Sequence, residues 1–414
     1  MASIFLHHVV GDLTVGKPEV AEFPETGTVA AAVRAIAECA EGAITVWRPA
    51  DAAAGERKVG RFVGMLNSLD LVAFLARSGD QERAMRTPVS EVVEPDPRLL
   101  KEVDPGTRLI DALEMMIQGA RRLLVRKSLT WRGVSKRFSI LYNGKWLNNF
   151  NNSTSSSTTT GKPSSSSLCA SADYKYCCLS REDIIRFLIG CLGALAPLPL
   201  SSISSLGAIT PHYYHIEASA PAIEAVRRLR QDPCAVAVVE TNPDGTHKIV
   251  GEISSYKLWR CDYLPAAWAL ANLSAGHFVM GAEDNDGSRL DSLSNLSMTS
   301  AFGDGGASPS SRPKKFSSRS IGFFSNPPSP MAVGGLRPAR RSMYRGRSAP
   351  LTCKHTSSLA AVMAQMLSHR ATHVWVTEAD SEEDDVLVGL VSYNDLLYAV
   401  TKYPTSSSAT PANT

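Results

Sequence analysis

Three segments of this 414-residue chain place a carboxylate three residues after a short polar side chain, directly behind an apolar run: Asn67/Asp70, Ser180/Asp183 and Ser392/Asp395. This is the spacing of a helix N-cap, in which the polar side chain accepts a backbone N–H bond and the carboxylate lies in the positive first turn. A carboxylate at the end of a strand can also accept the hydroxyl protons of a ribose. Capping alone would explain any single pair, so a nucleotide-binding interpretation depends on the recurrence.

The recurrence extends to a Val-Gly dipeptide in the apolar run. It occurs at Val63-Gly64, Val250-Gly251 and Val388-Gly389, and a glycine there allows a ligand or a neighbouring backbone to come close. Because the dipeptide and the carboxylate recur at the same places in the repeat, the pattern favours ligand binding over helix capping alone. After Val250-Gly251, however, Lys257 stands where the carboxylate is expected. An ammonium cannot accept hydroxyl protons, so we predict that this site is empty or contacts phosphate.

Basic residues in front of two predicted strands could hold phosphate groups. Arg121 and Arg122 can form bidentate bonds with a phosphate, and His373 occupies the corresponding place later in the chain. The alternative is that one residue of each group is merely solvated at a strand entrance. The other two units have Gly42-Ala43 and Pro233-Cys234 at this place. We therefore expect two well-equipped sites out of four.

No catalytic or metal-binding constellation is predicted. The sequence contains no GxSxG, phosphate-binding loop, HExxH or glycine-rich dinucleotide fingerprint. His369 and His373 have a spacing that a helix could turn toward one metal ion. A predicted change from helix to strand falls between them, and no third ligand is evident. The residue types therefore favour a regulator over an enzyme.

The junctions belong to a repeated unit of strand, amphipathic helix, two strands and a second helix. In the clearest copy, Leu359–Leu367 has a helical apolar face, and His373–Thr377 and Leu387–Val391 read as strands. In the third copy, Pro221–Leu229 is predicted as the first helix and Ser254–Lys257 as the start of the second. Four such β-α-β-β-α units predict an α+β fold built from α/β-type repeats. The units cover 8–80, 87–192, 199–262 and 348–402, with a helix predicted over 263–282.

The second unit carries an insert over about 127–176. Its run of Ser, Thr and Asn at 148–168 has too few apolar residues to offset the entropy of ordering the chain. Before that run, RFSILYNGKWL alternates apolar and polar residues around Asn143-Gly144, which is a hairpin signature. We therefore predict a disordered insert with one hairpin.

A second segment predicted to be disordered spans 283–347 and is rich in Gly, Ser, Pro and Arg. Between residues 306 and 349 it has nine basic residues and no acidic one, so the positive charge of the chain is concentrated there. Arg345 stands three residues before Ser348, and Pro350 follows. Phosphorylation would add roughly two negative charges at Ser348, and the site would then resemble a ligand of 14-3-3-type phospho-serine readers. An unregulated solvated linker is the alternative.

Composition excludes several classes of protein. The net charge is +3, and aromatic residues are sparse among the arginines of the basic segment, so nucleic-acid binding is not favoured. The longest apolar stretch, 184–200, contains Arg186 and is broken by Pro197 and Pro199, so it is too short and too interrupted for a membrane span, which needs about 20 residues. No secretory signal is visible. The eight cysteines form no CxxC pair. We expect a cytoplasmic location, with the nucleus as the alternative.

The junctions resemble a known family. VGMLNSLDL (63–71) and VGLVSYNDL (388–396) are similar to the closing strand and helix of the CBS domain, the cystathionine-β-synthase domain. The opening MASIFLHHVVGDLTVGKP, RFVGMLNSLDLVAFLA and RATHVWVTEAD resemble plant CBS domain-containing proteins of the CBSX type. That group is itself similar to the γ regulatory subunits of AMP-activated protein kinases. The resemblance covers most of the predicted ordered chain and implies two modules, each a pair of repeats around a pseudo-two-fold axis (Bateman modules).

The resemblance also implies clefts that take AMP, ADP, ATP or another adenosine compound. In such clefts the junction carboxylate holds the ribose and basic residues hold the phosphates. The ribose residues implied here are Asp70, Asp183 and Asp395, assisted by Ser180 and Ser392. The phosphate residues implied are Arg121, Arg122 and His373.

The function expected on this basis is that of a non-catalytic regulator. It would sense adenosine nucleotides and pass their occupancy to a partner such as the catalytic or scaffold subunits of a protein kinase. Pairing of its modules into a homodimer is a further expectation. The alternatives are an interaction scaffold whose clefts are filled by side chains, and a redox regulator of thioredoxin-type proteins.

Overall fold

The computed structural model describes 4–49, 58–127, 140–142, 145–147, 175–228, 232–281, 349–378 and 386–402. All of these residues belong to one unit of the chain, which comprises 1–282 and 344–414. The Ser/Thr/Asn-rich run at 148–168, the basic segment 283–347 and Ser348 lie outside the described residues. The predictions of disorder and of a phospho-serine site made for them are therefore untested.

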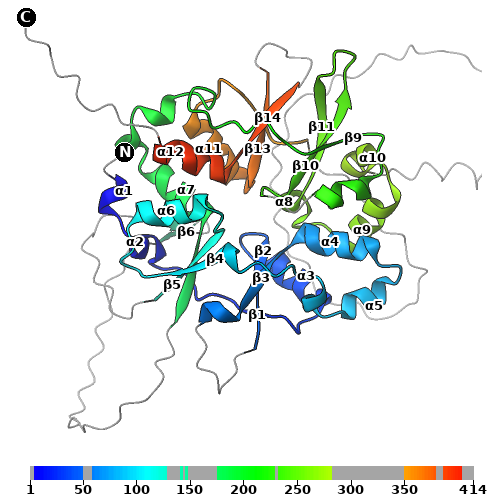
Figure 1. The fold of residues 1–414 in the computed structure, drawn as a ribbon, viewed down its shortest axis with the longest axis horizontal. Coiled ribbons are helices and arrows are strands. Elements are labelled where there is room, and N and C mark those ends of the chain that lie inside the picture. Colours follow the sequence, from blue (N-terminus) through cyan, green and yellow to red (C-terminus); the bar gives the residue numbers. More distant parts are fainter. Residues whose placement is uncertain are drawn as a thin grey trace, which may run out of the picture. The chain divides into compact units, whose positions relative to one another are not determined.

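Four three-stranded sheets share one topology (Figure 1). In each, the first strand pairs in parallel with the second, and the second pairs antiparallel with the third. This is the pattern predicted from the repeated unit. The strands are β1 (Phe23–Pro24), β2 (Ala43–Trp47) and β3 (Phe62–Asn67); β4 (Leu100–Val103), β5 (Arg122–Arg126) and β8 (Tyr176–Ser180); β9 (His215–Glu217), β10 (Ala235–Thr241) and β11 (His247–Ser254); and β12 (Thr352–Lys354), β13 (His373–Thr377) and β14 (Leu387–Ser392).

Each sheet has one helix between its first and second strands and another after its third strand, which confirms the mixed helix and sheet fold of four repeats. The first helices of the repeats are α3 (Val29–Glu38), α6 (Leu109–Ile117), η6 (Ala222–Arg228) and α11 (Leu359–His369). The closing helices are α4 (Ser68–Arg77), α7 (Arg181–Gly190), α8 (Ser255–Leu258) and α12 (Tyr393–Lys402).

The third repeat departs from the predicted pattern. Its first helix, predicted over Pro221–Leu229, is the 3₁₀ helix η6, and its closing helix α8 is a single turn. Within the described part of the chain, Ser254 at the N-cap of α8 makes no capping bond, and its buried hydroxyl has no hydrogen-bond partner. Lys257 offers no carboxylate to bond back to the cap, so the first turn lacks the stabilisation seen in the other three repeats.

Several further elements connect or flank the repeats. The segment 263–282, predicted as a helix, holds two helices, because Ser274 caps a new one by accepting the N–H of His277. Strands β6 (Ile140–Tyr142) and β7 (Lys145–Leu147) pair antiparallel, which confirms the predicted hairpin. The remaining helices are α1 (Ile4–His7), α2 (Val10–Thr14), α5 (Gln81–Arg86), α9 (Tyr263–Asn272) and α10 (Ala275–Met280). The remaining 3₁₀ helices are η1 (Lys58–Arg61), η2 (Val89–Glu91), η3 (Pro97–Leu99), η4 (Leu192–Leu195) and η5 (Leu198–Leu200).

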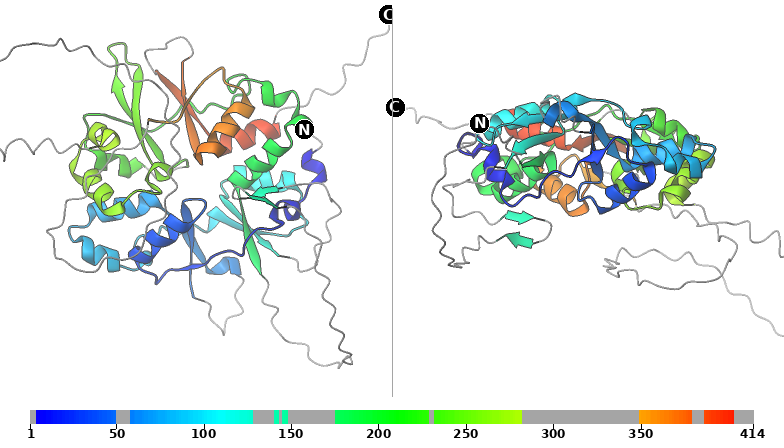
Figure 2. Two further views of the ribbon diagram at one scale, coloured as in Figure 1. Left: turned by 180° about the vertical axis from the view of Figure 1, so that it is seen from behind. Right: turned by 90° about the horizontal axis from the view of Figure 1, so that it is seen from below.

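Two large cores join the helices of non-consecutive repeats. The first and third repeats share one core, in which α4 packs against α8 and α9. The second and fourth share the other, in which α6 and α7 pack against α11 and α12. Figure 2 shows the second arrangement from behind, with the orange and red helices α11 and α12 beside the green α7. Packing of the helices in these two cores therefore joins the first two repeats to the last two.

Two smaller apolar clusters join the sheets of consecutive repeats. Trp47 and Phe62 of the first repeat pack with Leu124 and Tyr176 of the second. A matching cluster, centred on Trp375, joins the third and fourth sheets. Consecutive repeats thus pair through their sheets, as expected for two Bateman modules. In the described part of the chain, no helix is long and apolar enough to span a bilayer.

Candidate functional site

Asp70 stands at the junction between β3 and α4. Asn67 caps α4 by accepting the N–H groups of Leu69 and Asp70, and Asp70 Oδ2 accepts the N–H of Asn67 at 2.9 Å. In the described part of the chain, that backbone group is the single hydrogen-bond donor to this carboxylate. The capping function therefore leaves most of the acceptor capacity of Asp70 unused, since a carboxylate has about four lone-pair positions.

Asp70 lines a cavity of about 420 Å³, which lies within the roughly 300–1,000 Å³ typical of small-molecule sites. Met65, Leu69 and Phe74 supply apolar wall. The polar lining includes the carboxylates of Asp70, Glu91, Glu94 and Asp96 and the guanidinium groups of Arg77 and Arg121. The cavity therefore combines apolar side chains, against which a base could pack, with acceptors for hydroxyl groups.

Burial raises the pKa of Asp70 to about 6. The bond from the Asn67 N–H and the charge of Arg121 oppose that rise, whereas the nearby charge of Glu94 adds to it. Asp70 is thus ionised near neutrality and becomes a neutral acid in a mildly acidic solution. As a carboxylate it accepts hydroxyl protons well, and as an acid it does so poorly.

Gly64 explains the shape of this cavity. The segment Glu91–Asp96 crosses β3, and the N–H of Asp96 bonds to the carbonyl of Val63 at 3.0 Å. A Cβ atom at Gly64 would lie 2.6 Å from the carbonyl oxygen of Glu94. The glycine therefore admits a neighbouring backbone, which then forms the cavity wall.

We expect Gly64→Ala to push this segment away from β3 and to reduce stability by about 1–3 kcal/mol, the usual cost of overpacking. Urea denaturation followed by circular dichroism measures the change. Gly79→Ala is the matched control, because a Cβ atom there meets nothing within 4 Å. Equal stability of the two variants would contradict the close approach.

Arg121 connects the Asp70 cavity to a smaller central cavity. The central cavity has a volume of about 130 Å³ and is lined by residues of all four repeats. Arg121, Asn67 and Cys234 line both cavities. The other guanidinium groups of the central cavity belong to Arg122, Arg181 and Arg370, and its carboxylates to Glu41, Glu182 and Asp232. A nucleotide whose ribose bonds to Asp70 could therefore place its phosphate beside Arg121. The phosphate would then face the other guanidinium groups of the central cavity.

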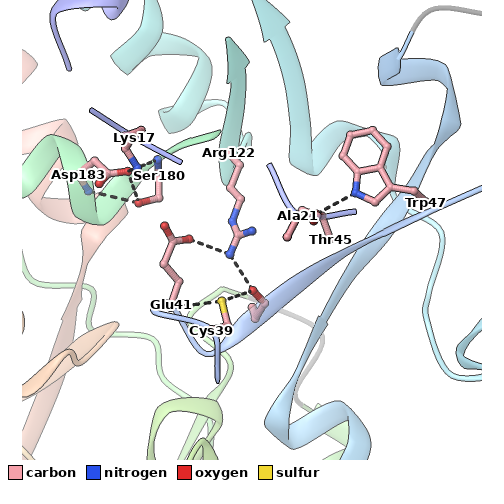
Figure 3. Close-up of polar contacts among 10 residues, drawn as sticks. Lys17, Ala21, Cys39, Glu41, Thr45, Trp47, Arg122, Ser180 and Asp183 are labelled. Carbon is pink, nitrogen blue, oxygen red and sulfur yellow. Dashed lines mark hydrogen bonds and ion pairs between the residues drawn. The ribbon is translucent and has the colours of Figure 1, made fainter. Parts of the chain in front are cut away.

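Asp183 has the same local geometry as Asp70 but a different neighbour. Its Oδ2 accepts the N–H and the hydroxyl of Ser180, each at 2.8 Å, and lies 2.6 Å from Lys17 Nζ (Figure 3). The side chains of Lys17 and Asp183 are only 7% and 10% exposed. Among the described residues, Asp183 therefore forms an ion pair with Lys17, whereas Asp70 forms none.

Arg122 is also engaged by the protein. Its Nη2 lies 2.7 Å from Glu41 Oε2 and donates to the carbonyl of Ala43 at 2.9 Å (Figure 3). The side chain is 10% exposed. The predicted phosphate ligand Arg122 is therefore paired within the protein, whereas Arg121 lies 3.8 Å from Asp232 and at about 4 Å from Cys234 Sγ.

Asp395 lies in the first turn of α12, and both of its carboxylate oxygens accept hydrogen bonds. Ser392 donates its N–H and hydroxyl to Oδ2 at 2.8 and 2.7 Å, and Thr210 donates its hydroxyl to Oδ1 at 2.8 Å. Thr210 lies in the segment that leads into β9. Ser392 thus assists Asp395 as a cap, as Ser180 assists Asp183, and the role of either pair toward ribose stays a prediction.

The third junction holds a buried polar cluster. Glu252 of β11 is 5% exposed and bonds to His373 Nε2 at 2.8 Å, Trp375 Nε1 at 3.1 Å and the Tyr256 hydroxyl at 2.6 Å. Lys257 Nζ lies 3.7 Å from Glu252 and donates to the carbonyl of Ala349 at 2.8 Å. Both ring nitrogens of His373 have protein partners, since Nδ1 lies 3.1 Å from the Thr372 hydroxyl.

The four junctions share one further feature, which relates the members of each pair of repeats. In each pair (repeats one and two, repeats three and four), the segment before the first strand of one repeat contacts the other repeat. The contact lies where the third strand of that other repeat meets its closing helix. Lys17 reaches Asp183, Glu91–Asp96 line the Asp70 cavity, Thr210 reaches Asp395 and Ala349 reaches Lys257. This exchange is what a pseudo-two-fold axis within each pair produces.

Three residues that contact these junctions were not predicted from the sequence, namely Lys17, Thr210 and Glu252. One signal was present for Glu252, a charged residue inside an apolar strand at the place where the first repeat has Met65. Lys17 and Thr210 belong to the segments in front of the strands, whose partners depend on how repeats pair. Sequence periodicity does not reveal that pairing.

Among the described residues, no group of three or more His, Cys, Asp or Glu side chains could hold a metal ion. Burial raises the pKa of Cys178 and of Cys234 to about 11 and that of Cys353 to about 12. A thiol with a raised pKa is a poor nucleophile at neutral pH.

Comparison with known proteins identifies the family. A model of the CBS domain matches residues 346–402, which contain the fourth repeat. The chain is 62% identical over 426 aligned residues to the Arabidopsis thaliana CBS domain-containing protein CBSX6, covering 100% of this chain and 97% of that protein. It belongs to the CBS domain-containing proteins of the CBSX type. Arabidopsis thaliana CBSX5 is 28% identical, with 97% of this chain and 99% of that protein covered.

Solved structures with a similar arrangement include two archaeal proteins. One, from Methanocaldococcus jannaschii, was proposed as a homologue of γ-AMPK and has 12% identity, a TM-score of 0.48 and coverage of 94% of this chain and 99% of its own. The other, from Pyrococcus horikoshii, has 13% identity, a TM-score of 0.41 and coverage of 95% and 100%.

Proposed function

We propose that this CBS domain protein is a non-catalytic regulator that binds an adenosine nucleotide in the Asp70 cavity. The observation that carries the proposal is a carboxylate with one backbone donor at the wall of a 420 Å³ cavity. The ribose hydroxyls would bond to Asp70, the base would lie against Met65 and Phe74, and a phosphate would lie beside Arg121.

The charges lining the two cavities support this orientation. Four carboxylates and two guanidinium groups line the Asp70 cavity, so its wall is suited to hydroxyl groups more than to phosphates. Four guanidinium groups and three carboxylates line the central cavity. The nucleoside would therefore occupy the larger cavity and one phosphate the entrance to the smaller one. A nucleotide with a short phosphate chain, such as AMP, suits this space best.

Binding of the nucleotide in the Asp70 cavity would affect a partner protein through Arg121. Its neighbour Asp232 belongs to the third repeat and also pairs with Arg181 of the second. A phosphate that draws Arg121 away from Asp232 would weaken a contact between the two halves of the chain. A ligand that binds one arrangement of the repeats more tightly shifts the population toward it. We propose a protein kinase complex as the regulated partner and the cytoplasm as the location.

A scaffold function is the second candidate, because protein groups already engage the other three junctions. Titration calorimetry of the full chain with AMP, ADP and ATP separates the candidates. We expect one equivalent of nucleotide to bind, with AMP tightest. No binding of any adenylate would overturn the sensor and favour the scaffold.

The pKa of Asp70 gives a pH dependence. Its value of about 6 in the folded chain means that adenosine affinity should be constant above about pH 7. Below pH 6, affinity should fall roughly tenfold for each further pH unit, as the acceptor becomes protonated. Calorimetry between pH 7.5 and 5 measures it. Adenosine is the appropriate ligand, because the phosphate of AMP itself titrates near pH 6. An affinity unchanged at pH 5 would show that Asp70 does not hold the ligand as a carboxylate.

A further inference from the structure

Three side chains that line the central cavity carry donors without a partner in the described part of the chain. The hydroxyl of Tyr393 and Nε of Arg181 are buried and unbonded. The guanidinium of Arg370 lies over the ring of Trp259 at 5.7 Å, and no carboxylate of the described residues lies within 4 Å of it. Buried polar groups are almost always bonded to protein, water or a ligand. The grouping of these donors at one cavity therefore indicates a bound polar group.

Arg370 also has a backbone conformation that usually belongs to glycine. It is the C-cap of α11 with φ 53° and ψ 33°, and it is the one described residue other than glycine with a positive φ. A Cβ atom is disfavoured in this conformation, so glycine is the common residue at such a helix end. An arginine kept there, half-buried and at the wall of a cavity, indicates that its side chain has a use in that cavity.

The charge of the cavity wall favours an anion. Each carboxylate of the wall already has a guanidinium partner. The pairs are Arg122 with Glu41 (Figure 3), Arg186 with Glu182, and both Arg121 and Arg181 with Asp232. Two guanidinium groups share Asp232, and Arg370 has no such partner, so positive charge is in excess. Arg181 and Tyr393 also begin α7 and α12, whose helix dipoles place their positive ends there.

The cavity has room for a small polyatomic anion. Its volume of about 130 Å³ is roughly ten times what one water molecule requires and well below the roughly 300–1,000 Å³ of sites for larger ligands. Guanidinium groups are the donors best suited to phosphate-type oxyanions. We infer that the central cavity binds a free tetrahedral oxyanion, namely inorganic phosphate, through Arg370, Arg181 and Tyr393.

This site is separate from the phosphate position proposed for the nucleotide. Arg121 lines both cavities, whereas Arg181, Arg370 and Tyr393 line the central cavity and not the Asp70 cavity. These three residues come from the second and fourth repeats, so the anion would join the two repeats without any nucleoside. The protein would then respond to free phosphate as well as to an adenosine nucleotide.

The test is titration calorimetry of the full chain with inorganic phosphate in a buffer free of phosphate, first alone and then with saturating adenosine. We expect one equivalent of phosphate in both titrations, because adenosine has no phosphate group. Tyr393→Phe removes only the unbonded hydroxyl. It should weaken phosphate binding by roughly tenfold, whereas the Tm without phosphate should stay unchanged or rise.

Arg370→Gly separates binding from structure. Phosphate binding should weaken by at least about tenfold. The Tm without phosphate should be maintained or raised, because glycine is the residue that this backbone conformation favours. Arg260→Gln is the matched control, since Arg260 lies over the same Trp259 ring at 5.0 Å but is exposed and does not line the cavity. Its phosphate affinity should stay within a factor of two of the wild type.

The outcomes distinguish this inference from the proposed function. A wild-type chain that binds no phosphate, or an Arg370→Gly chain that binds it as tightly as Arg260→Gln, would overturn the inference and leave the Asp70 site untouched. Loss of phosphate binding in saturating adenosine would also overturn it, because the ion would then occupy the Asp70 cavity. If adenosine does not bind but phosphate binding depends on Arg370, the inference stands and the proposed nucleotide site fails. If Arg370→Gly does not fold, an undiminished phosphate affinity of Tyr393→Phe would overturn the inference.

Discussion

Asp70→Ala should weaken adenosine and AMP binding by about 100-fold or more. A hydrogen bond to a charged group contributes about 1.5–3 kcal/mol, and a ribose can donate two hydroxyl protons to one carboxylate. The fold should survive, because the substitution removes one capping bond and at the same time relieves a buried charge whose pKa is raised to about 6. Titration calorimetry measures the affinity, and circular dichroism confirms the fold.

Asp12→Ala is the matched control for this experiment. Asp12 bonds back to the N–H of Val9 at 3.1 Å in the same capping geometry, but it lines none of the cavities described above. Its substitution should leave nucleotide affinity within a factor of two of the wild type. If Asp70→Ala binds as tightly as Asp12→Ala, Asp70 only caps α4 and the nucleotide site lies elsewhere.

Glu252→Ala should cause the largest loss of stability among single substitutions at the junctions. The carboxylate is 5% exposed and serves His373, Trp375 and Tyr256 at once. Removing one partner of a buried pair costs about 3–5 kcal/mol, because the groups left behind are desolvated and unpaired. For a chain of this size we expect the Tm to fall by about 5–10 °C. Differential scanning calorimetry measures the change.

Acid should reproduce part of this effect in the wild type. Burial would raise the pKa of Glu252, but the charge and bond of His373 and the nearby Lys257 and Tyr256 hold it at about 2, below the ordinary 4.5. Because the folded value is the lower one, the stabilising contribution of this carboxylate is complete above about pH 4.5 and is lost as the pH falls toward 2.

Glu240→Ala provides the comparison for Glu252→Ala, since Glu240 lies exposed at the end of the neighbouring strand β10. Its Tm should stay within about 1 °C of the wild type. A Glu252→Ala chain as stable as Glu240→Ala would mean that the cluster at the third junction contributes little, and that this cleft could open to a ligand.

The repeat architecture could be predicted from the sequence because it depends on patterns within short segments of the chain. Apolar periodicity identifies α11 and β13, and the recurring cap and carboxylate mark where each sheet gives way to its closing helix. Lys257 identified the third repeat as the exception, and the one-turn helix α8 is the structural result. Local propensity and the hydrophobic pattern agree at these places, so the prediction is robust.

The partners of each junction carboxylate could not be predicted from the sequence, because they depend on contacts between repeats. Lys17 and Asp183 are distant in the sequence, and nothing in the periodicity of either segment indicates that they meet. The same holds for Thr210 with Asp395 and for Glu252 with His373. Three carboxylates that look alike in sequence therefore differ in the structure. Among the residues that the structure describes, Asp183 and Asp395 have partners from another repeat, whereas Asp70 bonds only to its own cap.

A crystal structure of the full chain grown with AMP would show whether the nucleotide binds at Asp70. We expect electron density for one nucleotide between β3 and the segment Glu91–Asp96. Both ribose hydroxyls should lie within about 3.2 Å of the Asp70 carboxylate, with the phosphate next to Arg121. A nucleotide bound at another junction, or an Asp70 cavity without nucleotide in crystals grown at saturating AMP, would contradict it.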